Sequence, residues 1–133
     1  MSYPADSDRL IDALVGRPDA VRTLDRLSAE GVAVSIVSYG EIFEGAYGAP
    51  NPVAQLEHFR AYLARFPVVP LSDPVMARFA FRAKLRDAGL LIPDFDLAIA
   101  ATALEHDLTL ITGNRRHFGR IAGLRLYEPD DPR

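Results

Sequence analysis

The chain has 133 residues, of which 49% are hydrophobic and 25% are charged, with no cysteine and a formal net charge of −3. This length and composition predict one compact domain over residues 1–133. The lack of cysteine excludes disulfides and thiolate metal sites and is typical of a reducing cytoplasm, and without a long apolar run or a basic leader we expect neither a membrane span nor a secretory signal. The acidic balance argues mildly against passive nucleic-acid binding, although a bound divalent cation would reverse the charge locally.

Strands and helices alternate in the first half of the chain. A short or irregular strand is expected around Pro4, because proline lacks the N–H group that a central strand donates. Apolar residues at helical spacing predict two helices, at Leu10 to Val15 and at Val21 to Leu27. The β-branched segment Val32 to Val37 predicts a buried strand, and a helix is expected to begin near Ser38.

The second half continues this alternation. A helix is expected over Leu56 to Phe66, then a short strand at Val68 and Val69, and then a helix that Asp73 caps and that extends through Leu85. The last expected elements are an alanine-rich helix from Asp96 to Glu105, a strand from Leu108 to Thr112, a turn or helix from Asn114 to Phe118, and a strand from Leu124 to Tyr127. The alternation predicts a three-layer α/β/α sandwich with a mainly parallel central sheet.

Several acidic and amide residues fall where the predicted strands end or the helices begin. Asp6 follows the first strand, Glu41 lies in the first turn after the second, and Asn114 follows a later strand. Asp94 and Asp96 begin a helix. The carboxyl ends of parallel strands meet at one sheet edge, where ligand sites form. Clustered carboxylates repel one another, and Mg²⁺ or Mn²⁺ relieves that repulsion. The sequence therefore predicts a metal site at this edge.

Each candidate also has a purely structural interpretation. Ser38 and Glu41 have the spacing of a capping box, in which the glutamate satisfies backbone donors. Asp6, Asp94 and Asn114 each stand where a side chain caps a helix. Taken singly, each residue fits a cap, whereas their common position at one sheet edge favours a metal site. Ser38 could serve both purposes by holding the Glu41 carboxylate in place.

The basic residues offer weaker candidates. The three histidines lack the spacing of a zinc site. Arg115, Arg116 and His117 follow directly after Asn114, where they could meet phosphate or simply face solvent. A second set shares one predicted helix face at four-residue spacing and could hold RNA or an acidic partner, or face water: Arg78, Arg82 and Arg86.

Four segments resemble, in order and spacing, the motifs of PIN-domain ribonucleases. They are Asp6-Ser7-Asp8 with Leu10-Ile11-Asp12, then Ser35 to Glu41, Asp96 to Ala103, and Leu108 to Phe118. The resemblance covers nearly the whole chain and is strongest to the VapC toxin branch of bacterial and archaeal toxin–antitoxin pairs. The third and fourth motifs together are quite specific.

This resemblance implies a PIN-like α/β/α sandwich, dependence on Mg²⁺ or Mn²⁺, and endonucleolytic cleavage of RNA. Asp6, Glu41 and Asp96 would be the metal-binding catalytic acids, and Asn114 matches the fourth position, which holds Asp or Asn in relatives. The residues that would order this site are Ser7, Ser38 and Thr112. The resemblance also implies a homodimer and a cognate VapB-like antitoxin that covers the active site, often with a basic side chain reaching the carboxylates.

Two departures from the family pattern bear on the prediction. Pro4 and Ala5 stand before Asp6, where relatives have an apolar strand. Asn114 adds no charge, so Asp94 is the candidate for a further metal or water contact. The leading hypothesis is hydrolysis of an RNA phosphodiester by metal-activated water. The alternatives are a catalytically degenerate PIN-like module that acts through protein contacts, and a metal-dependent phosphatase.

Overall fold

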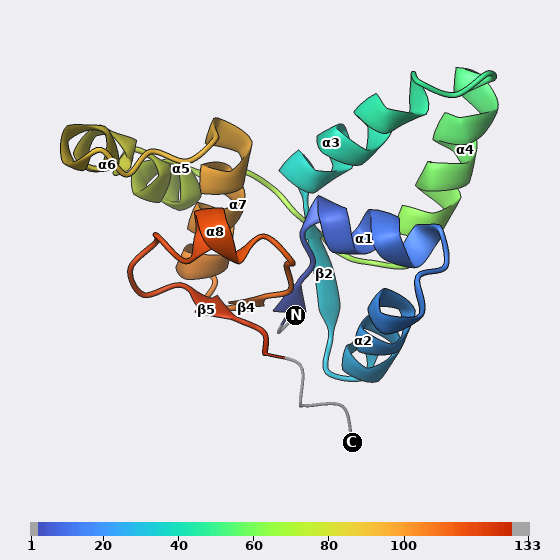
Figure 1. Ribbon diagram of the computed structural model, residues 1–133, viewed down its shortest axis with the longest axis horizontal. Helices are drawn as coiled ribbons and strands as arrows, with labels where there is room; N and C mark the ends of the chain where they lie inside the picture. Colours follow the sequence, from blue (N-terminus) through green and yellow to red (C-terminus); the bar gives the residue numbers. More distant parts are fainter. Residues whose placement is uncertain (1–2, 129–133) are drawn as a thin grey trace.

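A parallel sheet with helices packed on both sides organises the computed structural model, which describes residues 3–128 (Figure 1). Residues 1, 2 and 129–133 of the predicted domain lie outside the described part. The strands are β1 (Tyr3–Pro4), β2 (Val32–Ser35), β3 (Val68–Val69), β4 (Thr109–Leu110) and β5 (Arg125–Leu126). A parallel bridge between Ala5 and Ile111 links the three strands β3-β2-β1 to the pair β4-β5, which gives one continuous strand order. The predicted α/β sandwich is confirmed.

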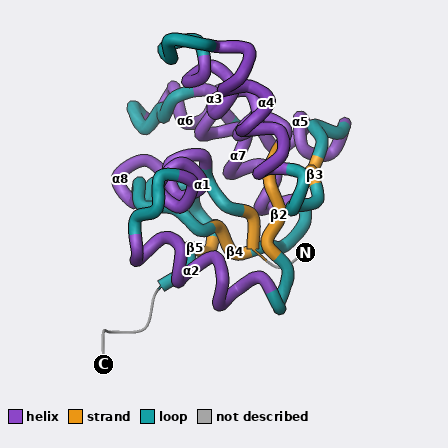
Figure 2. The backbone as a smooth tube through the Cα atoms, turned by 90° about the vertical axis from the view of Figure 1, so that its right-hand side faces the viewer, coloured by secondary structure: helices purple, strands orange, loops and turns teal. Residues whose placement is uncertain are grey.

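The helices surround these strands, as Figure 2 shows. They are α1 (Ser7–Leu14), α2 (Pro18–Ser28), α3 (Ile36–Ala46), α4 (Pro52–Leu63), α5 (Asp73–Phe79), α6 (Arg82–Ala88), α7 (Asp94–Glu105) and α8 (Arg115–Phe118). Helices α3 and α4 rise together from one end of the sheet, whereas α5 packs along α7 (Figure 1). Within residues 3–128, no helix has both the length and the apolar character that a bilayer span requires.

Strand β1 is short and contains Pro4, as the sequence predicts, yet it lies between β2 and β4. The N–H of Ala5 donates to the Ala33 carbonyl on the β2 side at 2.9 Å, and the N–H of Asp6 donates to the Ile111 carbonyl on the β4 side at 2.9 Å. Backbone nitrogens of successive residues point to opposite neighbours, so the Pro4 nitrogen points toward β4. Because proline has no N–H group, one hydrogen bond between β1 and β4 is missing there. The Pro4 carbonyl still accepts from Ile111 at 2.8 Å, and the strand therefore still carries Asp6 to the sheet edge.

Strand β2 ends two residues earlier than the β-branched segment predicts. Ser35 is the N-cap of α3, and its hydroxyl accepts from the Val37 N–H at 3.1 Å. The predicted helix start near Ser38, and with it the capping box to Glu41, is therefore wrong. Ser38 is buried inside α3, and its hydroxyl has no hydrogen-bond partner among the described residues. An early serine cap outweighs the strand preference of the following Ile36 and Val37.

The helix expected to run from Asp73 through Leu85 is two helices. Ser72, rather than Asp73, caps α5 by accepting from the Val75 N–H at 3.3 Å. Helix α5 ends at Phe79 and α6 begins at Arg82, so the predicted shared helix face of Arg78, Arg82 and Arg86 is wrong. The apolar periodicity continues through the break, which is why the sequence pattern does not reveal it.

Two apolar clusters hold the layers together. One fills the space under α1 to α4, and its largest fully buried members include Leu10, Val34 and Leu63. The other joins α7, β4 and α8, where Phe118 is 0% exposed against Ile99 and Leu110. Because α7 is rich in alanine, its backbone packs closely against its neighbours along most of its length.

We predict that Phe118→Ala lowers the free energy of unfolding by about 3–5 kcal/mol, because it leaves a cavity in the second cluster. Phe95→Ala is the matched control, since Phe95 is 56% exposed and its loss should change stability by no more than about 0.5 kcal/mol. Urea unfolding of both variants measures the difference. Equal losses in the two variants would contradict this assignment of the core.

Candidate metal centre

Asp6 occupies the point where β1 passes into α1. Its side chain is almost fully enclosed, with 4% of the residue exposed. One carboxylate oxygen, Oδ1, accepts from the Ser7 N–H at 2.8 Å, which makes Asp6 the N-cap of α1. The other, Oδ2, accepts from the Thr112 hydroxyl at 2.8 Å. The carboxylate is therefore held between the start of α1 and the segment that follows β4.

Glu41 approaches Asp6 from α3. The Ser7 hydroxyl donates to Glu41 Oε1 at 2.9 Å, so Ser7 contacts both acids, one through its backbone and one through its side chain. Glu41 lies in the second turn of α3 rather than in its first, because the helix begins at Ile36. The sequence analysis expected Ser38 to fix the position of the Glu41 carboxylate, but Ser38 is buried elsewhere on the same helix. The hydroxyl that donates to Glu41 is that of Ser7.

Asp8 is a member of this cluster to which the sequence reasoning gave no role. Its Oδ1 is buried without a hydrogen-bond partner among the described residues. Its Oδ2 lies 3.3 Å from the place that a Cβ atom on Gly113 would occupy, so a glycine lets the loop after β4 pass close to the carboxylate. The sequence could have indicated this role. Asp6 and Asp8 stand two residues apart at the start of α1, so both carboxylates lie near the N-terminus of that helix.

Burial and mutual repulsion perturb the acids of this cluster. Burial, followed by the negative charge of Asp8, raises the pKa of Asp6 to about 7, although the hydrogen bonds from Thr112 and Ser7 oppose the rise. Burial likewise raises the pKa of Asp8, against the backbone N–H groups of Arg9 and Gly113. The pKa of Glu41 is raised mainly by burial, with Asp96 and Asp8 adding repulsion and the Ser7 hydrogen bond opposing it. Burial is thus the main cause for all three acids, and the Arg9 guanidinium offsets it in part at Asp8.

Asp96 faces the same cluster from the first turn of α7. Its Oδ2 lies 2.7 Å from Nδ1 of His117, and the side-chain nitrogen of Asn114 lies 2.9 Å from that same Nδ1. Because Nδ1 holds at most one proton, it can donate to the carboxylate or accept from the amide, but not both at once. His117 therefore contacts the acid, although its side chain remains 30% exposed.

Asn114 caps α8, as one of the two interpretations of the sequence predicts. Its Oδ1 accepts from the His117 N–H at 3.4 Å, and its own N–H donates to the Thr112 hydroxyl at 3.0 Å. Thr112 thus joins Asp6 to the start of α8. Asn114 reaches the acidic cluster through Thr112 and His117, and no hydrogen bond joins it directly to a carboxylate of the described residues.

The remaining predicted residues point elsewhere. Asp94 has a side chain that is 60% exposed and forms an ion pair with Arg82 at 2.7 Å, and Pro93 rather than Asp94 is the N-cap of α7. Arg115 pairs with Glu128 at 2.9 Å, and Arg116 is exposed. The structure therefore brings Asp6, Glu41 and Asp96 toward one place and leaves Asp94 at the surface.

The donor set fits a divalent cation in chemistry and charge. Mg²⁺ and Mn²⁺ prefer carboxylate oxygens, and burial together with repulsion from neighbouring acids raises the pKa values of Asp6 and Glu41. The unpartnered Oδ1 of Asp8 is a further oxygen available to a ligand or its bound water. Over residues 3–128, no three acidic or histidine side chains are arranged around one point as metal ligands. The acids instead form hydrogen bonds with Ser7, Thr112 and His117. Binding a cation would therefore require rearrangement of at least one side chain.

An acidic centre at the carboxyl edge of a parallel sheet, with helices on both sides (Figure 1), places this chain among the α/β proteins whose ligand sites form at that edge. The sequence model of the PIN domain matches residues 5–124, and the chain belongs to the PIN-domain family.

Relatives with curated names are similar over almost the whole length. Ribonuclease VapC2 of Haemophilus influenzae is 27% identical over 94% of this chain and 96% of that protein. The tRNA(fMet)-specific endonuclease VapC of Shigella flexneri is 26% identical over 96% of this chain and 98% of that protein. Among solved structures, VapBC2 from Rickettsia felis, bound to a DNA fragment from its promoter, contains a chain that aligns with a TM-score of 0.87. That chain is 26% identical, over 98% of this chain and all of its own length.

The raised pKa of Asp6 predicts a pH-dependent stability for the metal-free protein. The pKa of Asp6 rises from 3.8 to about 7 on folding, so its contribution to stability is fully present below pH 3.8 and is lost as the pH rises through 7. We therefore expect the free energy of unfolding to fall between about pH 4 and pH 7, and Asp6→Asn to reduce that fall, with Asp8 and Glu41 contributing the remainder.

Urea unfolding in the presence of a chelator, repeated across this pH range, measures the effect. Asp25→Asn is the control, because Asp25 is an exposed acid on α2 and its replacement should leave the profile unchanged. A wild-type profile that is flat over this range, or one that Asp6→Asn leaves unaltered, would show that Asp6 does not carry the buried charge.

Proposed function

We propose that this protein is an endoribonuclease that requires Mg²⁺ or Mn²⁺ and acts as the toxin of a toxin–antitoxin pair. The observation that carries the proposal is the convergence of the enclosed Asp6 with the half-buried Asp8 and Glu41, which Ser7 links to Asp6 and which Asp96 faces from α7. Such a group is unfavourable unless a cation neutralises it. Membership in the PIN-domain family and the similarity to VapC ribonucleases favour RNA as the substrate.

The proposed roles follow from the contacts of each residue. Asp6 and Asp96 are the main cation ligands, and Glu41 positions the cation or the attacking water. Ser7 and Thr112 orient the acids by donating to Glu41 and Asp6. A bound divalent cation would supply the activated water and the charge that stabilises the leaving oxygen.

His117 belongs to the same proposed machinery. Its Nδ1 lies 2.7 Å from Asp96 Oδ2, and Asn114 fixes the start of the short helix that carries it. We assign Asn114 to the support of this contact rather than to the cation. Asp94 has its own partner in Arg82, so it takes no part in the proposed chemistry.

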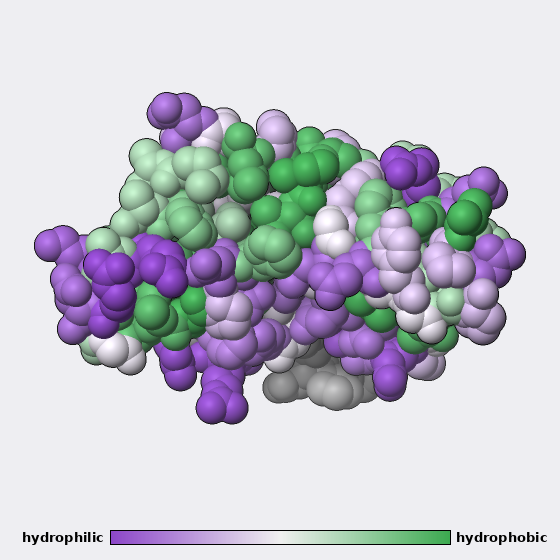
Figure 3. Space-filling view, turned by 90° about the horizontal axis from the view of Figure 1, so that it is seen from above, coloured by the Kyte–Doolittle hydropathy of each residue, from purple (hydrophilic) through white to green (hydrophobic). Residues whose placement is uncertain are grey.

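We propose a VapB-like antitoxin as the partner and a homodimer as the assembly. The related R. felis structure is a VapBC2 complex with DNA. In this chain, apolar groups gather on the face seen from above, over the region of α3 and α7 (Figure 3). Ile36 at the start of α3 is 42% exposed and Phe95, beside Asp96, is 56% exposed. An antitoxin segment lying there would cover apolar surface and carboxylates together.

The reducing cytoplasm, which holds the RNA, is the proposed location.

Asp96→Asn tests the proposed function directly. We expect Mn²⁺-dependent cleavage of RNA to fall more than about 100-fold. Loss of a residue that only supports a metal ligand costs roughly 10–100-fold, and loss of the ligand itself should cost more. Mapping of cleavage sites on total RNA, followed by assays on tRNA, measures the loss. The sequence neighbour Asp94→Asn is the control, and it should cleave like the wild type.

Three results would contradict parts or all of the proposal. Unchanged cleavage by Asp96→Asn would remove Asp96 from the site. A wild-type protein that neither cleaves RNA nor gains thermal stability in millimolar Mn²⁺ would favour the degenerate binding module instead. Turnover of small phosphate esters without RNA cleavage would favour the phosphatase.

A further inference from the structure

A cavity of about 250 Å³ lies directly beside the carboxylate centre. Its walls come from α1, α2, the segment after β4, α8 and the end of β5. They are Arg9, Asp19, Thr23, the run Ile111-Thr112-Gly113, Arg115 and Tyr127. We propose that this cavity binds the phosphate and sugar of the nucleotide adjacent to the scissile phosphodiester. The inference rests on the proposed ribonuclease function and assigns it a substrate subsite.

The cavity and the acidic centre share the same segment of chain. Thr112 lines the cavity, and its hydroxyl donates to Asp6 Oδ2 at 2.8 Å. Gly113 also lines it, and a Cβ atom there would lie 3.3 Å from Asp8 Oδ2 and 3.8 Å from Arg9 Cδ. The acids and the cavity are therefore separated by no more than the width of one residue. A polymer with one phosphate at the acids could place its next unit in this cavity.

Two guanidinium groups give the cavity the chemistry that a phosphate needs. Arg9 reaches Asp12 and Asp19 at 3.3 Å each, and Arg115 reaches Glu128 at 2.9 Å. The side chains of Asp19 and Glu128 are 67% and 75% exposed, and ion pairs this exposed contribute little stability. A phosphate, which accepts paired N–H donors from arginine, can replace these carboxylates.

The charge distribution of the chain supports the same assignment. The net charge is −3, so RNA must find local positive charge to bind. One flank of the acidic centre holds Arg9 on α1 and Arg115 and Arg116 on α8, and it becomes positive when a phosphate displaces the exposed carboxylates of Asp19 and Glu128. The substrate strand is thus expected to leave the acids over this flank.

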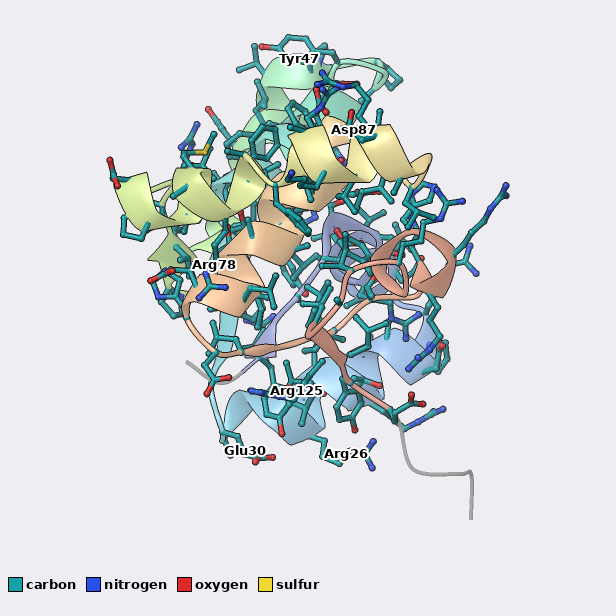
Figure 4. All side chains as sticks on the ribbon, turned by 90° about the vertical axis from the view of Figure 1, so that its left-hand side faces the viewer. Arg26, Glu30, Tyr47, Arg78, Asp87 and Arg125 are labelled. Carbon is teal, nitrogen blue, oxygen red and sulfur yellow. The ribbon has the colours of Figure 1, made fainter. Side chains whose placement is uncertain are left out.

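Tyr127 gives the cavity a fixed aromatic wall. Its ring meets Tyr3 edge-on, with centroids 5.8 Å apart, and its hydroxyl accepts from Arg26 at 2.8 Å. Arg26 projects from α2 beneath the end of the sheet (Figure 4). Rigid aromatic walls suit unstacked nucleotides of single-stranded RNA. The cavity is below the roughly 300–1,000 Å³ typical of drug-sized ligands, so it suits one nucleotide unit.

Arg115→Gln is the principal test, because the Arg115 side chain is 47% exposed and its loss should not impair folding. The substrate is a short RNA that contains the mapped cleavage site. We expect KM to rise about tenfold with kcat nearly unchanged, because a charge-assisted contact to a non-reacting group is lost. Arg9→Gln should act in the same direction. Arg22→Gln, an exposed arginine of α2 outside the cavity, is the matched control and should behave as wild type.

A modified substrate separates this contact from a general charge effect. One phosphate next to the scissile bond is replaced by a neutral methylphosphonate. We expect this change to raise the wild-type KM about tenfold but to have little further effect on Arg115→Gln, because both changes remove the same contact. The Mn²⁺-induced rise in melting temperature should be the same in wild type and variant, which shows that the acidic centre is intact.

The outcomes distinguish this inference from the function on which it rests. If the wild type cleaves RNA but both cavity variants keep the wild-type KM, the subsite is wrong and the function stands. The subsite is also wrong if the methylphosphonate effect persists unchanged in the variants. If the wild type does not cleave RNA at all, both proposals fail.

Discussion

The enclosed carboxylate of Asp6 is the constraint around which the site is built. Ser7 holds one of its oxygens and Thr112 the other, so β1, α1 and the segment after β4 meet at a single charged group. Ser7 also reaches Glu41 on α3. A negative charge so enclosed and so near other acids is unfavourable in the metal-free protein, which is why the pKa of Asp6 is raised to about 7. The fold thus accepts a local loss of stability at the place where it would bind a cation.

The other polar contacts determine which acids share that place. His117 meets Asp96, whereas Arg82 draws Asp94 toward α6 at the surface. Two aspartates only two residues apart on α7 therefore have different surroundings. On the opposite flank, Arg9 and Arg115 line a cavity that shares Thr112 with the acids. Acidic side chains and arginines thus lie side by side at this edge of an acidic chain.

Local sequence patterns predicted most of the fold. The buried β-branched strand, the alanine-rich helix and the short strand around Pro4 are all present. The errors occur where two local preferences compete. Ser35 caps α3 and ends β2 early, although the β-branched residues after it favour a longer strand. The chain also breaks between α5 and α6 although the apolar period continues. The periodicity of apolar residues predicts neither the early end of β2 nor the break between the two helices, because each depends on a single hydrogen bond or turn.

The sequence by itself determined the family, the alternation of strands and helices, and the positions of Asp6, Glu41 and Asp96 near strand ends and helix starts. These features depend on residue order and spacing, which the chain carries directly. Only the tertiary structure decided that Asp8 lies beside the other acids, that His117 contacts Asp96 and that Asp94 pairs with Arg82 at the surface. Such contacts join segments far apart in the chain. Which donor a carboxylate meets depends on how helices pack against the sheet, and no local pattern records that packing.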